Sequence, residues 1–155
     1  MAEADRGVGA TTIVQVGVIV RDIEAKAQAW SSILGLPMPP IATTDTVDVA
    51  HTTYEGQPSP ARAKLAFFHL GQVDVELIEP IDGPSTWQDQ VEQHGDSLHH
   101  IALRIKGMDE KVTYLESKGA RSIQRGDYTG GRYAYVDTTA QLGLVLELLE
   151  NFDQA

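Results

Sequence analysis

A carboxylate interrupts the apolar run GLVLELLE near the C-terminal end of the sequence. Side chains of a strand alternate between its two faces, so this residue, Glu147, shares a face with Val145 and Leu149 and is expected to be buried. A buried carboxylate without a partner is costly, so it takes up a proton, pairs with a cation or coordinates a metal ion. The run DVELIEP carries a second carboxylate, Glu76, in a similar setting. Either carboxylate could also act as a base that removes a proton from a substrate.

Two more polar side chains occupy inward positions of other predicted strands. Gln15 lies in TTIVQVGVIV on the face opposite the valines, and His100 lies in LHHIALRI. An amide oxygen, an imidazole nitrogen and two carboxylates suit an octahedral Co, Ni, Zn, Mn or Mg ion and leave two positions for water or substrate. The sequence therefore predicts one divalent metal ion, held by Gln15, Glu76, His100 and Glu147.

Each of these residues also has an ordinary structural explanation. A single interior histidine is usually a hydrogen-bonded core residue, and a strand glutamate often pairs with an arginine, for which Arg104 and Arg132 are available. Arg104 lies two residues beyond His100 on the same strand face, and Arg132 follows a Gly-Gly turn. Both arginines are therefore also candidate contacts to a substrate carboxylate or phosphate. His99 is expected to point away from His100 and to be structural.

The elements that would position these side chains occur twice in the same order. The first set is a strand over 11–20, a helix begun by Asp22 and ended by Gly35, a strand at Thr46–Tyr54, and a hairpin over 63–80 that turns near Gly71. A short helix from Ser85 to Gly95 then connects the two halves.

The second set is a strand in LHHIALRI, a helix in MDEKVTYLESKG, and strands in RSIQ, RYAYVD and GLVLELLE. QVGVIVRDIEAK aligns with HIALRIKGMDEK, and DVELIEP aligns with VLELLEN. Gln15 thus corresponds to His100 and Glu76 to Glu147, which indicates a repeated βαβββ unit. The alternative is that strands look alike because they share few residue types. The predicted organisation is a disordered N-terminus over 1–10, a first module over 11–80, a connector helix over 81–97 and a second module over 98–150.

The composition narrows the class of protein. The 155 residues, 42% of them hydrophobic, suffice for one domain or for two small modules that share a core. The 22 acidic and 12 basic residues give a net charge of -10, which argues against a nucleic-acid partner. There is no cysteine, no apolar run long enough to span a membrane and no apolar signal-peptide core at the N-terminus. We therefore expect a cytoplasmic protein without a membrane partner.

On these motifs the sequence resembles the vicinal oxygen chelate superfamily over residues 13–150. The resemblance implies an α+β fold in which two βαβββ modules, the glyoxalase-like arrangement, form a curved mixed sheet around a metal-binding cleft. The family's metal positions fall on Gln15, Glu76, His100 and Glu147. The resemblance also implies a homodimer.

Within this superfamily the sequence is similar to methylmalonyl-CoA epimerases through QVGVIVRDIEAK, VELIEP, LHHIALRI and GLVLELLE. The first metal position is typically His and the second typically Gln in those enzymes, whereas the order Gln, Glu, His, Glu resembles animal-type glyoxalase I. The positions that would grip glutathione carboxylates are Ile19, Pro80 and Asp96, and none is basic or an amide. The carboxylate base of the epimerases maps near 65–66, where this sequence has Leu and Ala.

The resemblance implies a metal-dependent epimerase or isomerase that removes a proton alpha to the carbonyl of a small molecule, with a CoA thioester as one candidate substrate. Glu147 is the predicted base and Glu76 the alternative. Two alternative hypotheses remain: a glyoxalase-I-like lactoylglutathione lyase and a non-catalytic small-molecule binding protein. Ring-cleaving dioxygenases rank lower, because they hold Fe(II) with two histidines and one carboxylate, and only one histidine stands at the four positions here.

Overall fold

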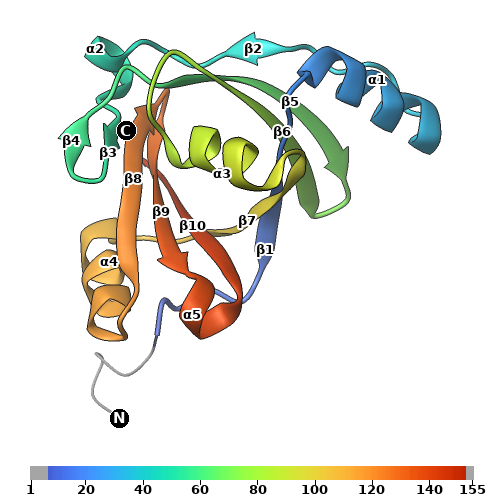
Figure 1. Cartoon of the computed structure of the whole chain (residues 1–155). Coiled ribbons are helices and arrows are strands. Elements are labelled where there is room, and N and C mark those ends of the chain that lie inside the picture. The colour runs from blue at the N-terminus through green and yellow to red at the C-terminus, as the bar shows by residue number, and fades with distance from the viewer. Residues whose placement is uncertain (1–6, 153–155) are drawn as a thin grey trace.

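A computed structural model describes residues 7–152 and shows one curved sheet of ten strands with helices on its faces (Figure 1). In chain order the strands are β1 (Ile13–Ile19), β2 (Ala42–Thr43), β3 (Thr53–Tyr54), β4 (Gln57–Pro58), β5 (Arg62–Leu70), β6 (Val73–Ile81), β7 (Ser97–Arg104), β8 (Arg121–Tyr128), β9 (Gly131–Thr138) and β10 (Leu144–Asn151). The helices are α1 (Ile23–Leu34), α2 (Val47–Ala50), α3 (Thr86–His94), α4 (Met108–Ser117) and α5 (Thr139–Leu142).

The sheet consists of two similar halves that meet where β1 pairs antiparallel with β7. The strand order is β2-β5-β6-β1-β7-β10-β9-β8-β3-β4. Within the first half β1 runs parallel to β6, and within the second β7 runs parallel to β10, while the remaining pairs are antiparallel. The predicted α+β fold with a curved mixed sheet is confirmed.

Local signals in the sequence begin and end the helices. The Asp22 carboxylate accepts a hydrogen bond from the backbone N–H of Ala25, and α1 ends at Gly35, whose φ of 69° is cheap only without a side chain. The Ser85 hydroxyl likewise accepts from the N–H of Gln88 at the start of α3, which ends at Gly95. These helices lie where the sequence predicted them.

One face of the sheet carries α1 and α4, and the other carries α3. Burial of apolar side chains stabilises each contact at roughly 25 cal/mol per Å². The core under α1 is formed by Val20, Ile23, Ala27, Ala66, Phe68, Val75 and Leu77. The core under α4 contains Met108, Val112, Leu115, Ala134, Val136, Leu146 and Leu148. Trp87 and Val91 of α3 pack on the opposite face against Ile19, Ala63, Ile78, Ile123 and Tyr135.

The segment after β2 differs from the predicted strand at Thr46–Tyr54. Residues 47–50 form α2, His51 ends this helix in the left-handed region with a φ of 51°, and only Thr53 and Tyr54 are extended. The alternating letters TVDV imitate a strand, but one helical turn is too short for periodicity to distinguish the two. β3 pairs with β8, so this segment runs from the β5 edge of the sheet to the β8 edge (Figure 1).

The sequence predicted disorder for residues 1–10, and the structure describes this segment from residue 7 onward. Residues 1–6 lie outside the described part of the chain. Val8 and Ala10 pack against the core under α4. Among residues 7–152 no helix is both long and apolar enough to cross a lipid bilayer.

Candidate metal centre and active-site cavity

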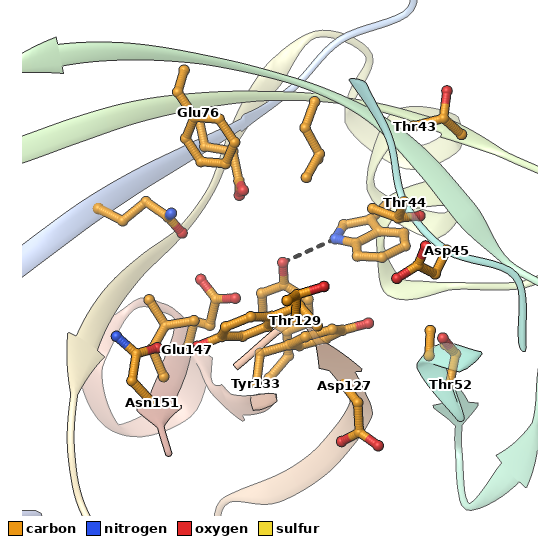
Figure 2. A pocket seen from close by; sticks show the side chains of 18 of the residues that line it. Thr43, Thr44, Asp45, Thr52, Glu76, Asp127, Thr129, Tyr133, Glu147 and Asn151 are labelled. Carbon is orange, nitrogen blue, oxygen red and sulfur yellow. Dashed lines mark hydrogen bonds between the residues drawn. The ribbon is translucent and has the colours of Figure 1, made fainter. Parts of the chain in front are cut away.

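A cavity of about 430 Å³ lies on the face of the sheet that also carries α3. Both halves line it: Gln15, Leu65, Phe67 and Glu76 come from the first, and Arg104, Tyr133, Tyr135, Glu147 and Leu149 from the second. Glu76 and Glu147 approach one end of the cavity, and Thr44 and Asp45 lie at the other (Figure 2). The cavity is large enough for a small ligand.

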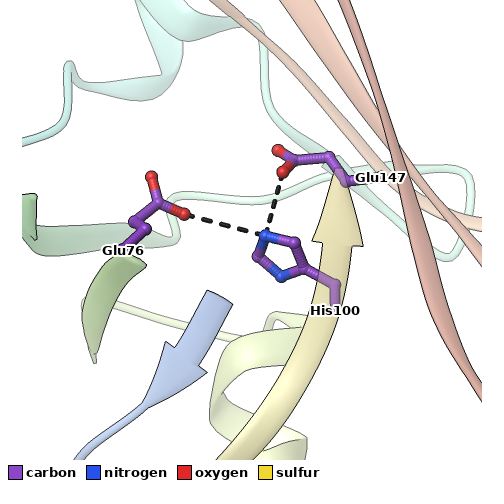
Figure 3. A group of neighbouring side chains, drawn as sticks. All are labelled: Glu76, His100 and Glu147. Carbon is purple, nitrogen blue, oxygen red and sulfur yellow. Dashed lines mark ion pairs between the residues drawn. The ribbon is translucent and has the colours of Figure 1, made fainter. Parts of the chain in front are cut away.

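Three of the four predicted metal ligands meet at one point. Nε2 of His100 lies 2.9 Å from Oε2 of Glu147 and 3.8 Å from Oε1 of Glu76. One potential ligand atom from each residue lies within 4.8 Å of the others, and all three side chains are buried (Figure 3). Gln15, the fourth predicted ligand, lines the same cavity.

Hydrogen bonding within residues 7–152 leaves this group unsatisfied. Oε1 of Gln15, Nε2 of His100 and Oε2 of Glu147 are buried without a hydrogen-bond partner. The 2.9 Å approach of Nε2 to Oε2 therefore lacks hydrogen-bond geometry. Buried polar atoms are rarely left unpaired, and a cation is the partner that several converging lone pairs can share. The residues present thus fit a divalent metal ion.

The repeated register explains why these side chains converge. Gln15 pairs with Asp74, two residues before Glu76, and His100 pairs with Val145, two residues before Glu147. Because residues two apart share a strand face, each parallel strand pair directs one first-strand ligand and one glutamate to the same side. The antiparallel junction of β1 and β7 then brings the two pairs together.

Burial dominates the electrostatics of the group. It raises the pKa of Glu147 to about 8, although the Tyr135 hydroxyl acts in the opposite direction. Burial, followed by the charges of Glu147 and Asp74, raises the pKa of Glu76 well above its ordinary value. Burial lowers the pKa of His100 to about 3, so its ring is neutral. Without a cation, the two carboxyls therefore resist ionisation.

A glycine makes room for the His100 ring. Gly17 on β1 is opposite His100 on β7, and a Cβ atom at Gly17 would lie 2.0 Å from Cε1 of that ring. Real carbon atoms never approach so closely without displacement. Only glycine at this position lets the imidazole turn into the cavity.

The sequence predicted that His99 points away from His100, and the structure shows that this prediction was wrong. Gly17 pairs with His100 and Val18 pairs with Leu98, so His99 is an extra residue in β7 that forms a β-bulge. The bulge breaks the alternation and turns His99 to the same side. Its Nδ1 lies 2.8 Å from Nδ1 of His100, and its ring packs edge-on against Tyr135.

The first turn of α3 contacts His99, which is next to His100 on β7, and Tyr135, which is opposite Glu147 on β9. Oγ1 of Thr86 lies 3.0 Å from Nε2 of His99. The indole N–H of Trp87 donates to the Tyr135 hydroxyl at 3.0 Å, and that hydroxyl interacts with Glu147. The connector helix is therefore part of the site, which its sequence did not indicate.

The two predicted substrate-binding arginines lie on different faces. Arg104 lines the cavity, makes no ion pair with an acidic side chain in residues 7–152, and is the only lysine or arginine among the described residues that does line it. Arg132 lies on the opposite face of β9, where Glu150 binds it at 2.7 Å and Asp109 at 3.6 Å. The prediction for Arg132 is thus corrected. Strand alternation places Arg132 opposite Tyr133, but which of the two faces the cavity follows only from the tertiary structure.

Two acidic residues of the cavity were not identified from the sequence. Asp45 follows β2, and Asp127 is near the end of β8, where its carboxylate pairs with Nδ1 of His51 at 2.9 Å. Both lie in segments without a recognisable motif, so only their place in the fold connects them with the cavity.

Comparisons with known proteins identify relatives of the whole fold. The chain is 27% identical to the uncharacterized protein YqjC of Bacillus subtilis (strain 168) over 138 residues, which cover 87% of this chain and 89% of that protein. Methylmalonyl-CoA epimerase from Mycobacterium tuberculosis has a similar structure, with a TM-score of 0.65, 19% identity, and coverage of 95% of this chain and 91% of that one. A hypothetical protein from Bacillus halodurans C-125 gives a TM-score of 0.64 at 20% identity, with 93% and 96% covered.

A further similar structure is the Streptomyces coelicolor methylmalonyl-CoA epimerase in complex with 2-nitronate-propionyl-CoA, with a TM-score of 0.63, 19% identity, and 92% of this chain and 95% of that one covered. At these identities the structures show the shared fold alone. The family model of the glyoxalase/bleomycin resistance protein/dioxygenase superfamily matches residues 14–136. Because this match spans most of the sequence and the structure has the corresponding fold, the chain belongs to the glyoxalase/bleomycin resistance protein/dioxygenase superfamily, also called the vicinal oxygen chelate superfamily.

Proposed function

We propose that this protein is a divalent-metal-dependent epimerase or isomerase that removes a proton alpha to the carbonyl of a small molecule. One observation carries the proposal. Glu76, His100 and Glu147 meet at one point, and Oε1 of Gln15, Nε2 of His100 and Oε2 of Glu147 are buried without a hydrogen-bond partner in the described part of the chain. A divalent cation is a partner that these converging lone pairs could share.

Gln15, Glu76, His100 and Glu147 would hold the ion. Their two carboxylates would neutralise its charge, and the neutral imidazole and amide would complete the protein's share of the ligands. A divalent ion bound there would act as a Lewis acid that stabilises negative charge on the substrate's carbonyl oxygen. Metals from Co, Ni, Zn and Mn to Mg suit this mixture of nitrogen and oxygen ligands.

Glu147 is the proposed base, and Glu76 is the second candidate. Both carboxyl groups line the cavity, so either can reach a bound substrate. The Trp87 indole donates to the Tyr135 hydroxyl, which leaves the hydroxyl hydrogen free for Glu147. This contact holds Glu147 in place while it takes up a proton and returns it.

Arg104 supports an anionic substrate. It lines the cavity without an acidic partner in residues 7–152, so it is available for a carboxylate or phosphate. One structure of similar fold, with a TM-score of 0.64, is a methylmalonyl-CoA epimerase in complex with methylmalonyl-CoA. We therefore propose an acyl-CoA thioester with a free carboxylate as the first substrate to test, and a cytoplasmic homodimer as the working form.

A lactoylglutathione lyase is the second candidate, favoured by the types of the four proposed ligands. The positions that would bind glutathione do not support it. Ile19 is fully buried, and Asp96 accepts a hydrogen bond from the N–H of Arg21 and pairs with Lys26 at 2.8 Å. Neither residue offers a positive charge to a carboxylate.

Exchange of the substrate's alpha proton tests the proposal. Cobalt-loaded protein is incubated with methylmalonyl-CoA in deuterated water, and deuterium uptake is followed by mass spectrometry. We expect one deuterium per substrate at a rate at least about 100-fold above that of the Glu147→Gln variant, because general base catalysis is worth about that much. Arg132→Gln, which changes a residue outside the cavity, is the matched control and should exchange normally.

The hemithioacetal of methylglyoxal and glutathione is run in parallel. Its conversion, with methylmalonyl-CoA untouched, would indicate the lyase. If metal-loaded protein leaves both compounds unchanged, both named activities are excluded and a binding protein remains.

A further inference from the structure

His99 occupies an unusual position for a residue next to a proposed metal ligand. The bulge in β7 turns its ring toward His100, and only 3% of the residue is exposed. Its Nδ1 lies 2.8 Å from Nδ1 of His100, and its Nε2 lies 3.0 Å from Oγ1 of Thr86. Each ring nitrogen of His99 therefore has one defined partner.

Hydrogen bonds connect His100 to His99 and His99 to Thr86. The number of hydrogens between the two rings determines which group donates in each of these bonds. Two facing Nδ1 atoms 2.8 Å apart can share only one hydrogen, because two N–H groups would collide. A metal ion at Nε2 of His100 requires that nitrogen to be bare, so the ring's hydrogen must be on Nδ1. Nδ1 of His99 must then accept, and the hydrogen of His99 must lie on Nε2, where it donates to Thr86.

We propose that His99 is a positioning residue that, together with Thr86, holds His100 in the tautomer whose bare Nε2 faces the metal. The inference rests on the proposed metal site and adds two residues that do not touch the ion. Metal-binding histidines generally donate their second ring N–H to a nearby acceptor. Here that acceptor is the His99 imidazole, which in turn donates to the Thr86 hydroxyl.

Packing and hydrogen bonds fix the positions of His99 and Thr86. The His99 ring packs edge-on against both His100 and Tyr135, with ring centroids 5.0 and 5.1 Å away. Thr86 is the first residue of α3, and its backbone N–H donates to Oε1 of Gln124 at 2.9 Å. Because all of these groups are buried, an unpaired N–H would cost free energy and water could not replace a lost partner.

Nuclear magnetic resonance of the wild-type protein loaded with Zn²⁺ tests the tautomers directly. Long-range ¹H–¹⁵N correlations of the imidazole rings distinguish a protonated nitrogen from a bare or metal-bound one. We expect His100 to be protonated at Nδ1 and metal-bound at Nε2, and His99 to be protonated at Nε2. The His99→Asn variant assigns the His99 signals. A His99 ring protonated at Nδ1 in the zinc-loaded protein overturns the proposal.

Zinc affinity, measured by competition with a chelating dye, tests the energetic role. Thr86→Val has nearly the shape of threonine but no hydroxyl, and we expect it to raise the Kd for Zn²⁺ about 3- to 10-fold, while Thr86→Ser stays within about 2-fold of wild type. His99→Leu should raise the Kd about 10- to 100-fold, the usual effect of removing such a partner. His99→Asn keeps an acceptor near the Nδ1 position and should recover most of the affinity.

Thermal unfolding of the metal-free variants controls for structural damage, and the Thr86 pair keeps the test valid if His99→Leu fails to fold. If wild-type protein binds zinc but Thr86→Val binds it as tightly as Thr86→Ser, the positioning role fails and the metal site stands. If wild-type protein binds no zinc at all, the proposed function and this inference both fail.

Discussion

The polar side chains of Gln15, Glu76, His100 and Glu147 are poorly matched to one another in the absence of a cation. Glu76 and Glu147 are buried with raised pKa values, and His100 is neutral because burial lowers its pKa. Oε1 of Gln15 adds another acceptor that has no donor in residues 7–152. Stability has therefore been given up at this point of the fold, as is common at functional sites.

The stability of the metal-free protein should fall as pH rises from about 6.5 to 8. The pKa of Glu147 is raised to about 8 and that of Glu76 is raised as well, so the unfolded chain loses protons above about 4.5 that the folded chain keeps. Stability therefore decreases as pH rises above about 4.5. For His99 and His100, whose pKa values are lowered, stability instead increases with pH up to about 6.5. Above 6.5 only the carboxyls contribute, by up to about 1.4 kcal/mol per pH unit each.

Urea unfolding of chelator-treated protein at several pH values measures this slope. Glu147→Gln should make the slope shallower, since one of the two carboxyls is gone. A metal-free wild type whose unfolding free energy rises between pH 6.5 and 8 would contradict the electrostatic account.

The two arginines should respond differently to the same substitution. Arg104→Gln should raise the KM for methylmalonyl-CoA about 10- to 100-fold and leave kcat nearly unchanged, because a charged hydrogen bond of roughly 1.5–3 kcal/mol is lost in ground and transition state alike. Arg132→Gln should leave KM within about 2-fold but lower the Tm, because Glu150 loses its partner. Steady-state kinetics and calorimetry measure both variants, and equal effects on KM would remove Arg104 from the site.

Three features of the elements determine the geometry of the site. Parallel pairing of β1 with β6 and of β7 with β10 directs the ligand side chains to one side. The bulge in β7 adds His99 to that side, and Gly17 in β1 leaves the space that the His100 ring occupies. α3 is more than a connector, because its first turn contacts His99 and Tyr135.

Gly17→Ala should damage the metal site more than the fold. The added methyl group would overlap the buried His100 ring, so we expect a loss of stability of about 1–3 kcal/mol, as in other overpacked cores, and a more than 10-fold increase in the Kd for Zn²⁺. Gly126→Ala is the matched control, since its methyl group would lie 2.7 Å from the Tyr133 ring on a neighbouring strand, away from His100. It should lower the Tm similarly and leave zinc affinity nearly intact. Equal Kd values in the two variants would show that Gly17 has no special role.

At the scale of the whole molecule, the proposed ion connects the two halves of the sheet. β1 and β6 of the first half provide Gln15 and Glu76, while β7 and β10 of the second provide His100 and Glu147. The segment from β2 to β3 also crosses from one edge of the sheet to the other and lines the cavity. The site is complete only when both halves are folded and paired.

Metal binding should therefore stabilise the entire fold. At a free Zn²⁺ concentration 100 times the Kd, the folded state gains about 2.7 kcal/mol, which corresponds to a rise in Tm of roughly 5–10 °C for a chain of this size. Differential scanning calorimetry with and without zinc measures the shift. Glu147→Gln should reduce it to a small fraction, and a wild-type shift below about 1 °C at saturating zinc would argue against a site shared between the halves.

Features that depend on neighbouring residues in the chain were predictable. Asp22 and Gly35 bound α1, Ser85 and Gly95 bound α3, and the turn at Gly71 joins β5 to β6, because caps and turns are set by local backbone conformation. The register of the repeat also followed from the letters, and it was this register that paired Gln15 with His100 and Glu76 with Glu147.

Features that depend on strand pairing were not predictable in the same way. The side to which His99 turns depends on a bulge that exists only where β1 and β7 meet, and the place of Asp45 in the cavity depends on a segment that crosses between sheet edges. The sequence alone predicts the repeated unit and the types of the four proposed ligands, because strand alternation and helix caps depend on residues that are near one another in the chain. Which side chains share one cavity, and which of two arginines reaches it, depends on contacts between residues far apart in the chain, and these form only when the two halves pack together.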